Sequence, residues 1–457
     1  MQGWIPNIAG SRSPKYLAIA EALLRDVEAN KLVAGARLPA QRALADALGV
    51  DLTTVTRAYG EAQRLGLIES DGRRGSFVRE RRVQEARPQR TDAGMNAPPE
   101  LAGGLLSVEF RRSAEELLGA SDALALQYQP RGGMPAAREA GARLLSARGI
   151  DCLDDSIVVT AGGQHALHAI FSAELQAGDV LAVPQFVYPG LIALARRFSV
   201  TLRALPFDRE GIDPDALSAL CEAEPIRGLY LVPTNDNPTT VTTSIAKRQA
   251  IARIAQRHDL LVIEDDAYGF LPEDPLPPIA SMVPERTWHV ASVSKILSPG
   301  LRVAWLRAPG VAQAWRLAAD LHETAVMAPP LNAAIVSQWA NNGLFARLVD
   351  EIRREAGWRQ QLVAKTLPTS AFCSQEHGYH LWVPLASKAD ERQIADALQP
   401  HGLSVIGSSA FATATDDPAA AVRVSLGGTL ERDQLGRALR LLGALMDVGG
   451  THKMSIV

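Results

Sequence analysis

The chain has 457 residues, of which 47% are hydrophobic and 21% charged, and its formal net charge is -3. It is longer than one ordinary domain and has enough apolar residues for two or three folded cores, which excludes disorder over most of its length. The near-neutral charge excludes a protein that coats nucleic acid or acidic membranes, so any DNA contact must be local.

Cysteine usage and hydropathy indicate where the protein functions. Cys152, Cys221 and Cys373 lie far apart without a CxxC spacing or a histidine cluster, so we expect no metal site and no disulfide framework. The first residues lack the apolar centre of a signal peptide, and no run of about 18 apolar residues occurs. These features predict a soluble cytoplasmic protein without a membrane partner.

The first elements in chain order predict a DNA-binding domain in residues 1–80. Residues 16–27, 40–50 and 53–66 each show a helical apolar pattern, and the last two are short and joined by a tight turn. Residues 67–80 contain two β-like stretches around a glycine-containing tip, which predicts a hairpin. Together these elements predict a winged helix-turn-helix.

The chain then changes character twice. Residues 81–104 are rich in arginine, proline and alanine without a regular apolar period, which predicts a linker. In residues 105–450, apolar runs alternate with helical stretches, which predicts an α/β fold with a mostly parallel sheet at about 150–329 and a small α+β part at about 330–450. Residues 332–362 predict one long amphipathic helix within the small part.

A recognition helix presents the side chains of its first turns to base edges in the major groove. In the third predicted helix these candidates are Thr53, Thr54, Thr56 and Arg57. Candidates for phosphate or minor-groove contacts are Arg42, Arg73 and Arg74. Each residue alone is better explained as an ordinary surface side chain, so the prediction depends on the ordered set.

Four stretches carry a specific resemblance: PKYLAIAEALL, GARLPAQRALADALGV, TTVTRAYGEAQRLGLI and GRRGSFV. In order and spacing, residues 14–80 resemble the winged-helix domain of GntR-type regulators, which implies double-stranded operator DNA as a partner. The family commonly carries an arginine just before its Thr-x-Val stretch, whereas Leu52 stands near that place here. We therefore expect different operator contacts.

The second part offers residues suited to pyridoxal phosphate (PLP). This cofactor requires a lysine for a Schiff base, an acid at the pyridine nitrogen and a donor to the phenolic oxygen. Lys295 follows a predicted strand, Asp265 ends another, and Tyr268 comes three residues later. A surface lysine and helix-capping loop acids are the alternative interpretation of these segments.

Further candidates surround that set. Ser292, Ser294 and Arg302 are placed to bind the phosphate, and the helix that starts near Gly163 and Gln164 presents free backbone N–H groups to it. Asn237 follows a strand and could donate to the phenolic oxygen, and Tyr188 could stack on the ring. Alone, each of these residues is better explained as part of a loop, a cap or a packed aromatic cluster.

The joint order of these motifs resembles fold-type I aminotransferases over about residues 105–445. The resemblance implies that Tyr128 reaches the phosphate held by a partner subunit, and that Arg423 pairs with an α-carboxylate of the substrate or effector. The family's Asn-Pro-Thr-Gly has glycine where Thr240 stands here, which predicts an altered loop.

The two halves together resemble the MocR subfamily of GntR-type regulators. The resemblance implies a homodimeric, PLP-dependent, sequence-specific regulator that senses an amino compound when the compound displaces Lys295 and forms an external aldimine. The alternative is a working aminotransferase with an appended DNA-binding domain, since every residue needed for transamination is present by analogy. A third interpretation, an empty and inactive scaffold, predicts no absorbance from bound PLP.

Overall fold

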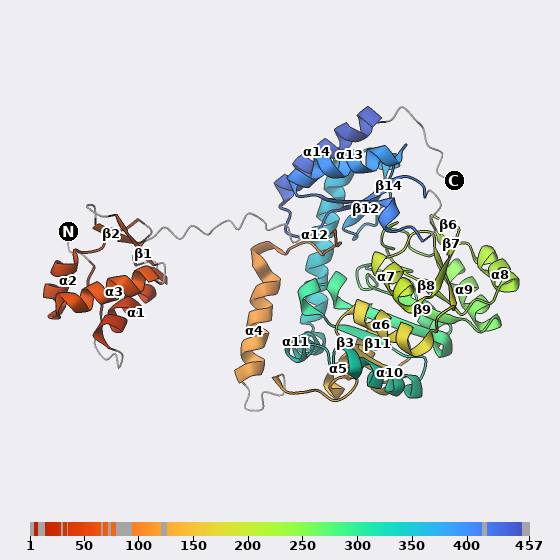
Figure 1. Ribbon diagram of the computed structural model, residues 1–457, viewed down its shortest axis with the longest axis horizontal. Coiled ribbons are helices and arrows are strands. Elements are labelled where there is room, and N and C mark those ends of the chain that lie inside the picture. Colours follow the sequence, from red (N-terminus) through yellow and green to blue (C-terminus); the bar gives the residue numbers. More distant parts are fainter. Residues whose placement is uncertain are drawn as a thin grey trace. The chain divides into compact units, whose positions relative to one another are not determined.

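In the computed structural model, the contacts divide the chain into two units, residues 1–91 and 92–457 (Figure 1). The structure describes residues 4–7, 14–28, 31–33, 35–64, 67–71, 75–78, 94–119, 126–413 and 418–449. Within these ranges, no helix is both long enough and apolar enough to cross a membrane.

The N-terminal unit is a winged helix-turn-helix, as its sequence predicts. Its elements are α1 (Lys15–Glu28), α2 (Gln41–Leu48), α3 (Leu52–Arg64) and an antiparallel pair of strands, β1 (Ile68–Asp71) and β2 (Gly75–Val78). Gly49 ends α2 in the left-handed conformation, with φ 61°, where its N–H bonds the carbonyls of Ala45 and Asp46. Leu23, Leu44 and Val55 bring the three helices into one apolar core.

The C-terminal unit is built on a seven-stranded sheet in the order β3-β11-β10-β9-β8-β4-β5. Its strands are β3 (Ile157–Thr160), β4 (Val180–Pro184), β5 (Thr201–Leu205), β8 (Gly228–Leu231), β9 (Leu261–Asp265), β10 (Thr287–Ser292) and β11 (Ala304–Arg307). Strand β11 runs antiparallel to β3 and β10, whereas the other neighbouring pairs are parallel. This confirms the mostly parallel sheet.

Helices pack around this sheet, and its central strands β8, β9, β10 and β11 are therefore buried along their whole length. The helices are α4 (Leu105–Gly119), α5 (Pro135–Ser146), α6 (Gly163–Glu174), α7 (Pro189–Phe198), α8 (Pro214–Ala223), α9 (Ile245–Arg257) and α10 (Val311–Thr324). A short hairpin, β6 (Phe207–Asp208) with β7 (Gly211–Ile212), lies outside the main sheet.

The small part contains an antiparallel sheet in the order β12-β14-β13, with helices packed on it. Its strands are β12 (His380–Pro384), β13 (Ser404–Gly407) and β14 (Ala421–Ser425), and its helices include α12 (Leu344–Thr366), α13 (Lys388–Leu398) and α14 (Arg432–Gly449). The predicted α+β character of this part is confirmed.

The single long helix predicted for residues 332–362 is wrong. The segment forms two helices, α11 (Pro330–Asn341) and α12, separated by Asn342 and Gly343. Gly343 adopts φ 80°, which breaks the helical path, and the Asn342 side chain accepts a hydrogen bond from the Leu344 N–H at 3.0 Å. The amphipathic pattern continues across the break, which explains the misassignment.

Part of the predicted linker belongs to the C-terminal unit. Residues 94–104 pack on this unit, where Pro99 pairs with Gly428 and the Glu100 N–H bonds the Gly428 carbonyl at 3.1 Å. The sequence analysis assigned these residues to the linker because they lack an apolar period. They are instead held by backbone hydrogen bonds, which leave no such period.

Candidate functional site

The site lies at the carboxyl ends of the parallel strands β8, β9 and β10. Asp265 is the last residue of β9, Asn237 lies in the loop after β8, and Lys295 ends the 3-10 turn Val293–Lys295 that follows β10. Because parallel strands end at the same edge of the sheet, three predicted residues that are far apart in sequence come together there.

Lys295 is a buried amine in a site of mixed charge. Burial, together with the Arg423 guanidinium, lowers the pKa of Lys295 to about 8, while the Asp265 carboxylate opposes the shift. The Lys295 Nζ donates to the backbone carbonyl of Asn96, and the Tyr379 hydroxyl donates to the backbone carbonyl of Lys295 at 2.5 Å. A lysine with this pKa has a substantial neutral, nucleophilic fraction near pH 8.

Asp265 is a buried carboxyl with a specific donor. The Tyr230 hydroxyl donates to its Oδ2 at 3.0 Å. Burial raises the pKa of Asp265 to about 6, against the lowering effect of the Tyr230 hydrogen bond. Above that pH it is an anion at the strand end, as a partner for a protonated ring nitrogen must be.

Tyr268 lies in a buried polar network that the sequence analysis missed. Asn96 Nδ2 donates to the Tyr268 hydroxyl at 3.1 Å and lies 3.1 Å from His380 Nδ1, while His380 Nε2 lies 3.0 Å from the Asp236 carbonyl. Burial raises the pKa of Tyr268 to about 12 and lowers that of His380 to about 3. At neutral pH, Tyr268 therefore keeps its proton and His380 is uncharged.

Arg423 lies beside this network, on β14. Its Nη1 donates to Asn237 Oδ1 at 3.0 Å, its Nη2 donates to the Gly94 carbonyl, and its guanidinium lies 5.1 Å from the centre of the Phe411 ring. A buried guanidinium of this kind suits a carboxylate ligand. The structure thus places Arg423 and Asn237 side by side, although 186 residues separate them in sequence.

The predicted phosphate-binding residues lie at the N-terminus of α6. Gly162 precedes the helix with φ 86°, and a Cβ atom there would lie 2.8 Å from Arg302 Nη2. Arg302 donates to the Ala161 carbonyl at 2.9 Å, and Gly163 packs near Ser292. The site therefore combines a helix N-terminus, a guanidinium and a hydroxyl, which together suit a phosphate.

Three further residues predicted for the cofactor site are Ser294, Gln164 and Tyr188. Among the described residues, the buried Ser294 hydroxyl has no hydrogen-bond partner. Gln164 donates to the Gly190 carbonyl at 3.3 Å, and Tyr188 lies close to both because Gly190 has no side chain. Burial and the Asp265 carboxylate raise the pKa of Tyr188, and the Arg302 guanidinium opposes this shift.

The donor set fits PLP. It contains a buried amine, an acid at a strand end, a protonated phenol, an amide and a phosphate cradle, together with the unused Ser294 hydroxyl. Tyr128, by contrast, is 83% exposed. Within this one chain it does not reach the site, and its role at a partner's phosphate stays a prediction.

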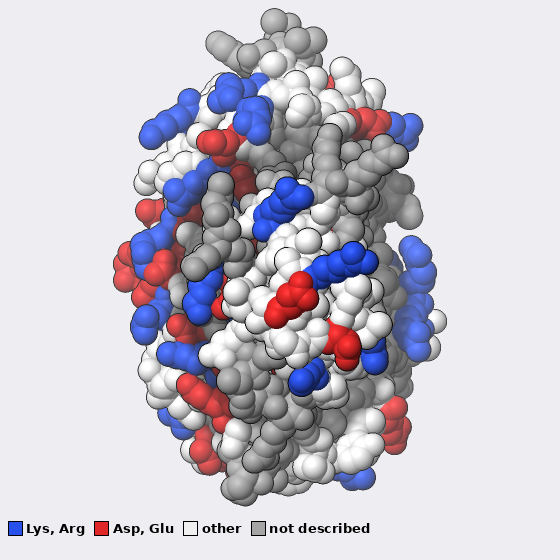
Figure 2. All heavy atoms as spheres, turned by 90° about the vertical axis from the view of Figure 1, so that its left-hand side faces the viewer, with Lys and Arg blue, Asp and Glu red and all other residues white. Residues whose placement is uncertain are grey.

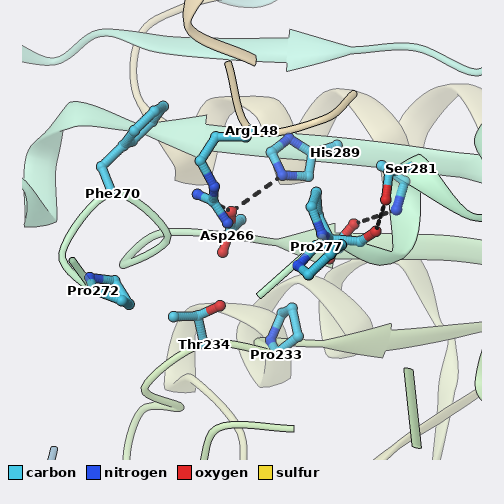
Figure 3. A network of polar contacts seen from close by, with 12 residues as sticks. Arg148, Pro233, Thr234, Asp266, Phe270, Pro272, Pro277, Ser281 and His289 are labelled. Carbon is cyan, nitrogen blue, oxygen red and sulfur yellow. Dashed lines mark hydrogen bonds and ion pairs between the residues drawn. The ribbon is translucent and has the colours of Figure 1, made fainter. Parts of the chain in front are cut away.

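A buried charged network surrounds Asp266, the residue that follows Asp265 in sequence (Figure 3). Arg148 Nη1 and His289 Nε2 lie 3.0 Å and 3.3 Å from Asp266 Oδ2, and Figure 3 shows both side chains directed at this carboxylate. Glu264 accepts from the backbone N–H groups of Ile279 and Ala280 at 2.9 and 2.8 Å. The acids on either side of Asp265 therefore have separate structural partners.

The candidate DNA-binding residues lie around the start of α3. Arg42, Thr53, Thr56 and Arg57 are exposed, and Thr54 is half-buried. The Thr56 hydroxyl donates to Gln41 Oε1 at 2.8 Å, and the Arg57 guanidinium lies 4.2 Å from the centre of the Tyr16 ring. Arg73 and Arg74 lie outside the described residues.

Charge on the side of the molecule drawn in Figure 2 is mixed. Among the side chains drawn in colour, lysine and arginine lie between aspartate and glutamate, without one continuous basic area. This agrees with the small net charge of the chain.

Sequence analysis missed four residues of the ligand site. Asn96 lies in the segment taken as a linker, Tyr230 is inside an apolar strand, and Asp236 and His380 carry no local motif. The signal that could have found Tyr230 and His380 is that each is a polar side chain in an otherwise apolar strand.

Comparisons with known proteins agree with both units. The family model for class I and II aminotransferases matches residues 94–442, and that for bacterial regulatory proteins of the gntR family matches residues 15–78. The first match begins at Gly94, which is also where the described part of the C-terminal unit begins.

Three similar proteins illustrate the likeness. The uncharacterized HTH-type transcriptional regulator YdeF of Bacillus subtilis is 28% identical over 97% of both chains. YjiR of Escherichia coli, another uncharacterized HTH-type transcriptional regulator, is 30% identical over 65% of this chain and 69% of its own. The crystal structure of LysN, an alpha-aminoadipate aminotransferase of Thermus thermophilus, has a TM-score of 0.69 at 24% identity and covers 78% of this chain and 91% of its own.

Proposed function

We propose that this chain, which belongs to the class I and II aminotransferases and carries a DNA-binding domain of the gntR family, regulates transcription. The regulating signal is an amino compound bound in its aminotransferase part. The order of the two domains is the MocR-like architecture of regulators. PLP is the cofactor that the family implies, and we propose the cytoplasm as the place of action.

One observation carries the proposal: the ligand site contains both a reactive amine and a carboxylate-binding group. Lys295 has a pKa near 8, and Arg423 is buried with its guanidinium next to Asn237. When bound, PLP supplies an aldehyde that bonds primary amines. A ligand with an amino group and a carboxylate therefore matches the site.

Each residue has a role in that arrangement. Lys295 holds the cofactor covalently, Asp265 keeps a proton on its ring nitrogen, and Tyr268 and Asn237 donate to its phenolic oxygen. Ser292, Ser294 and Arg302 bind the phosphate together with the backbone N–H groups of Gly163 and Gln164, and Tyr188 stacks on the ring. Arg423 binds the ligand's carboxylate.

We propose a homodimer in which Tyr128 completes the partner's phosphate site. Its side chain is 83% exposed, so it is available for contact with a second copy of the chain. Tyr128→Phe should weaken PLP binding without changing the mass of the assembly in solution. An unchanged PLP affinity would contradict this role.

The test is spectroscopic and uses the complete chain. PLP-loaded wild type and Lys295→Ala are compared by visible absorption, and wild type is then titrated with single amino acids while binding to the DNA upstream of its own gene is followed. We expect a Lys295-dependent band that shifts with one compound as DNA affinity changes. A band that shifts without any change in DNA binding would refute the regulatory function.

The alternative is a working aminotransferase, because every residue needed for transamination is present by analogy. Turnover with pairs of amino acids and keto acids decides between them, because metabolic enzymes reach about 1 per second or more. Turnover at that rate, together with DNA binding that no ligand alters, would establish the enzyme.

A further inference from the structure

The segment from Gly94 to Glu100 is built into the ligand site. Glu100 N–H bonds the Gly428 carbonyl at 3.1 Å, and the Gly428 N–H bonds the Pro98 carbonyl at 3.0 Å. A Cβ atom on Gly427 would lie 1.8 Å from the Ala97 carbonyl oxygen. These contacts fix the segment on the small part, so Asn96 within it has a defined position.

Asn96 is 1% exposed, and its carboxamide has a fixed orientation. The Asp236 carbonyl can only accept, so His380 Nε2, 3.0 Å away, carries the ring proton. Since burial lowers the pKa of His380 to about 3, its Nδ1 is unprotonated and must accept from Asn96 Nδ2 at 3.1 Å. The Asn96 carboxamide therefore has one orientation, with its nitrogen and not its oxygen facing His380.

The same nitrogen determines the direction of the Tyr268 hydroxyl. Asn96 Nδ2 has two hydrogens, one for His380 and one for the Tyr268 oxygen at 3.1 Å. Because the Tyr268 oxygen accepts from Asn96, its own hydrogen is free to point elsewhere in the site. The charged groups that act on Tyr268 are Arg423, which favours the phenolate, and Asp265 and Asp236, which oppose it.

We infer that Asn96 is a positioning residue that directs the Tyr268 hydrogen toward the cofactor's phenolic oxygen and so connects the ligand site with the segment leading to the DNA-binding unit. The inference rests on the proposed function. The boundary between the two units falls at residues 91 and 92, shortly before Asn96. A ligand that moves Tyr268 therefore also acts on Asn96 through their hydrogen bond. Asn96 belongs to residues 94–100, the first described residues of the C-terminal unit.

The test uses two Asn96 variants of the full-length protein loaded with PLP. Asn96→Ala removes the amide that donates to the Tyr268 hydroxyl, so this hydroxyl becomes a weaker donor to the cofactor's phenolic oxygen. More negative charge then stays on the phenolic oxygen, which holds the proton on the neighbouring Lys295 nitrogen more tightly. We expect the pH midpoint of the visible band to rise by about one unit. Asn96→Asp, nearly the same shape, accepts the Tyr268 hydrogen instead and should raise the midpoint further.

Two controls separate positioning from a loss of stability. Ser113→Ala removes another buried hydrogen bond of the same unit, the one from Trp339 Nε1 at 2.8 Å, and should leave the midpoint unchanged. In a Tyr268→Phe background, Asn96→Ala should have no further effect on the midpoint. An additional shift in that background, or no shift in the wild-type background, overturns the positioning role.

Hydrogen exchange and DNA binding test the connection between the units, with PLP alone as the probe. In wild type, PLP should slow amide exchange in residues 94–100 and alter DNA affinity, and both responses should be lost in Asn96→Ala. Intact responses in the variant overturn the inference while the proposed function stands. A wild type that binds PLP and DNA but shows no response to PLP also overturns the connection between the units, whereas the proposed function is refuted only when no amino compound changes DNA binding by the PLP-loaded protein.

Discussion

The Tyr230 hydroxyl donates its hydrogen to Asp265 Oδ2 across 3.0 Å, inside the sheet where β8 and β9 lie side by side. Both side chains are buried, so the bond acts in a medium of low polarity. It stabilises the charged form of Asp265 against the burial that raises its pKa to about 6.

Tyr230→Phe should therefore raise the pKa of Asp265 and weaken PLP binding. A hydrogen bond to a charged group contributes about 1.5 kcal/mol or more, so we expect a dissociation constant about tenfold higher at pH 7. The defect should shrink at higher pH, where Asp265 is ionised in both proteins. Fluorescence titration measures the affinity, and Tyr59→Phe, which removes the hydroxyl bonded to the Pro39 carbonyl, serves as the control.

Lys295 should attach PLP faster as the pH rises toward 8. Its pKa is about 8, so the neutral amine increases about tenfold for each pH unit below that value and levels off above it. Stopped-flow absorbance measures the attachment rate to PLP-free protein. A rate that continues to increase up to pH 10 would indicate an ordinary lysine pKa and contradict the burial effect.

Arg42→Ala should weaken DNA binding for all sequences alike. The exposed side chain at the start of α2 is expected to contact a phosphate, so its loss should reduce the salt dependence by about one counterion. Binding is measured over a range of salt concentrations. Arg203→Ala, which removes an equal charge from β5 in the other unit, should leave the slope unchanged.

The sequence predicts the elements of this protein better than their junctions. Strong periodicity predicts the winged helix and the parallel strands, and the positions of Asp265, Asn237 and Lys295 at or after strand ends predict the candidate ligand site. Asn96 was missed because it is held by long-range hydrogen bonds to residues 268 and 380, and such bonds leave no periodic signal. The break at Gly343 was missed because the apolar pattern continues on both sides.

Thr240 stands where the family has glycine, and its backbone is in a conformation that suits glycine better. It adopts φ 65°, the left-handed region that favours glycine. Its N–H bonds the Asp236 carbonyl at 2.7 Å, and its carbonyl accepts from Gln375 at 2.8 Å. These bonds hold a β-branched residue in a strained conformation.

Thr240→Gly should therefore stabilise the C-terminal unit by about 1 kcal/mol, because relief of the left-handed strain exceeds the added freedom of the unfolded chain. Urea unfolding followed by near-ultraviolet circular dichroism measures the change. Thr239→Gly is the matched control: it removes the hydroxyl bonded to Asp236 at 2.6 Å and should destabilise instead. A destabilised Thr240→Gly would show that no strain is present.

Asp266 should be one of the most sensitive positions for stability. Burial raises its pKa, but Arg148 and His289 lower it more, so the net pKa lies below the ordinary value. A lowered folded-state pKa means that the carboxylate stabilises the fold above the unfolded-state pKa of about 4 and that this contribution is lost as the pH falls further. At pH 7 the contribution is complete.

Asp266→Asn leaves Arg148 as a buried charge without its carboxylate, which costs about 3–5 kcal/mol in the free energy of unfolding. Asp259→Asn tests the contrast, because Asp259 pairs with Arg286 at the surface and is 79% exposed, so its loss should cost about 1 kcal/mol or less. Urea unfolding at pH 7 measures both variants. Equal costs would show that Arg148 pairs with another group or with water when the Asp266 carboxylate is removed. The Asp266 network would then contribute little to holding Asp265 in position.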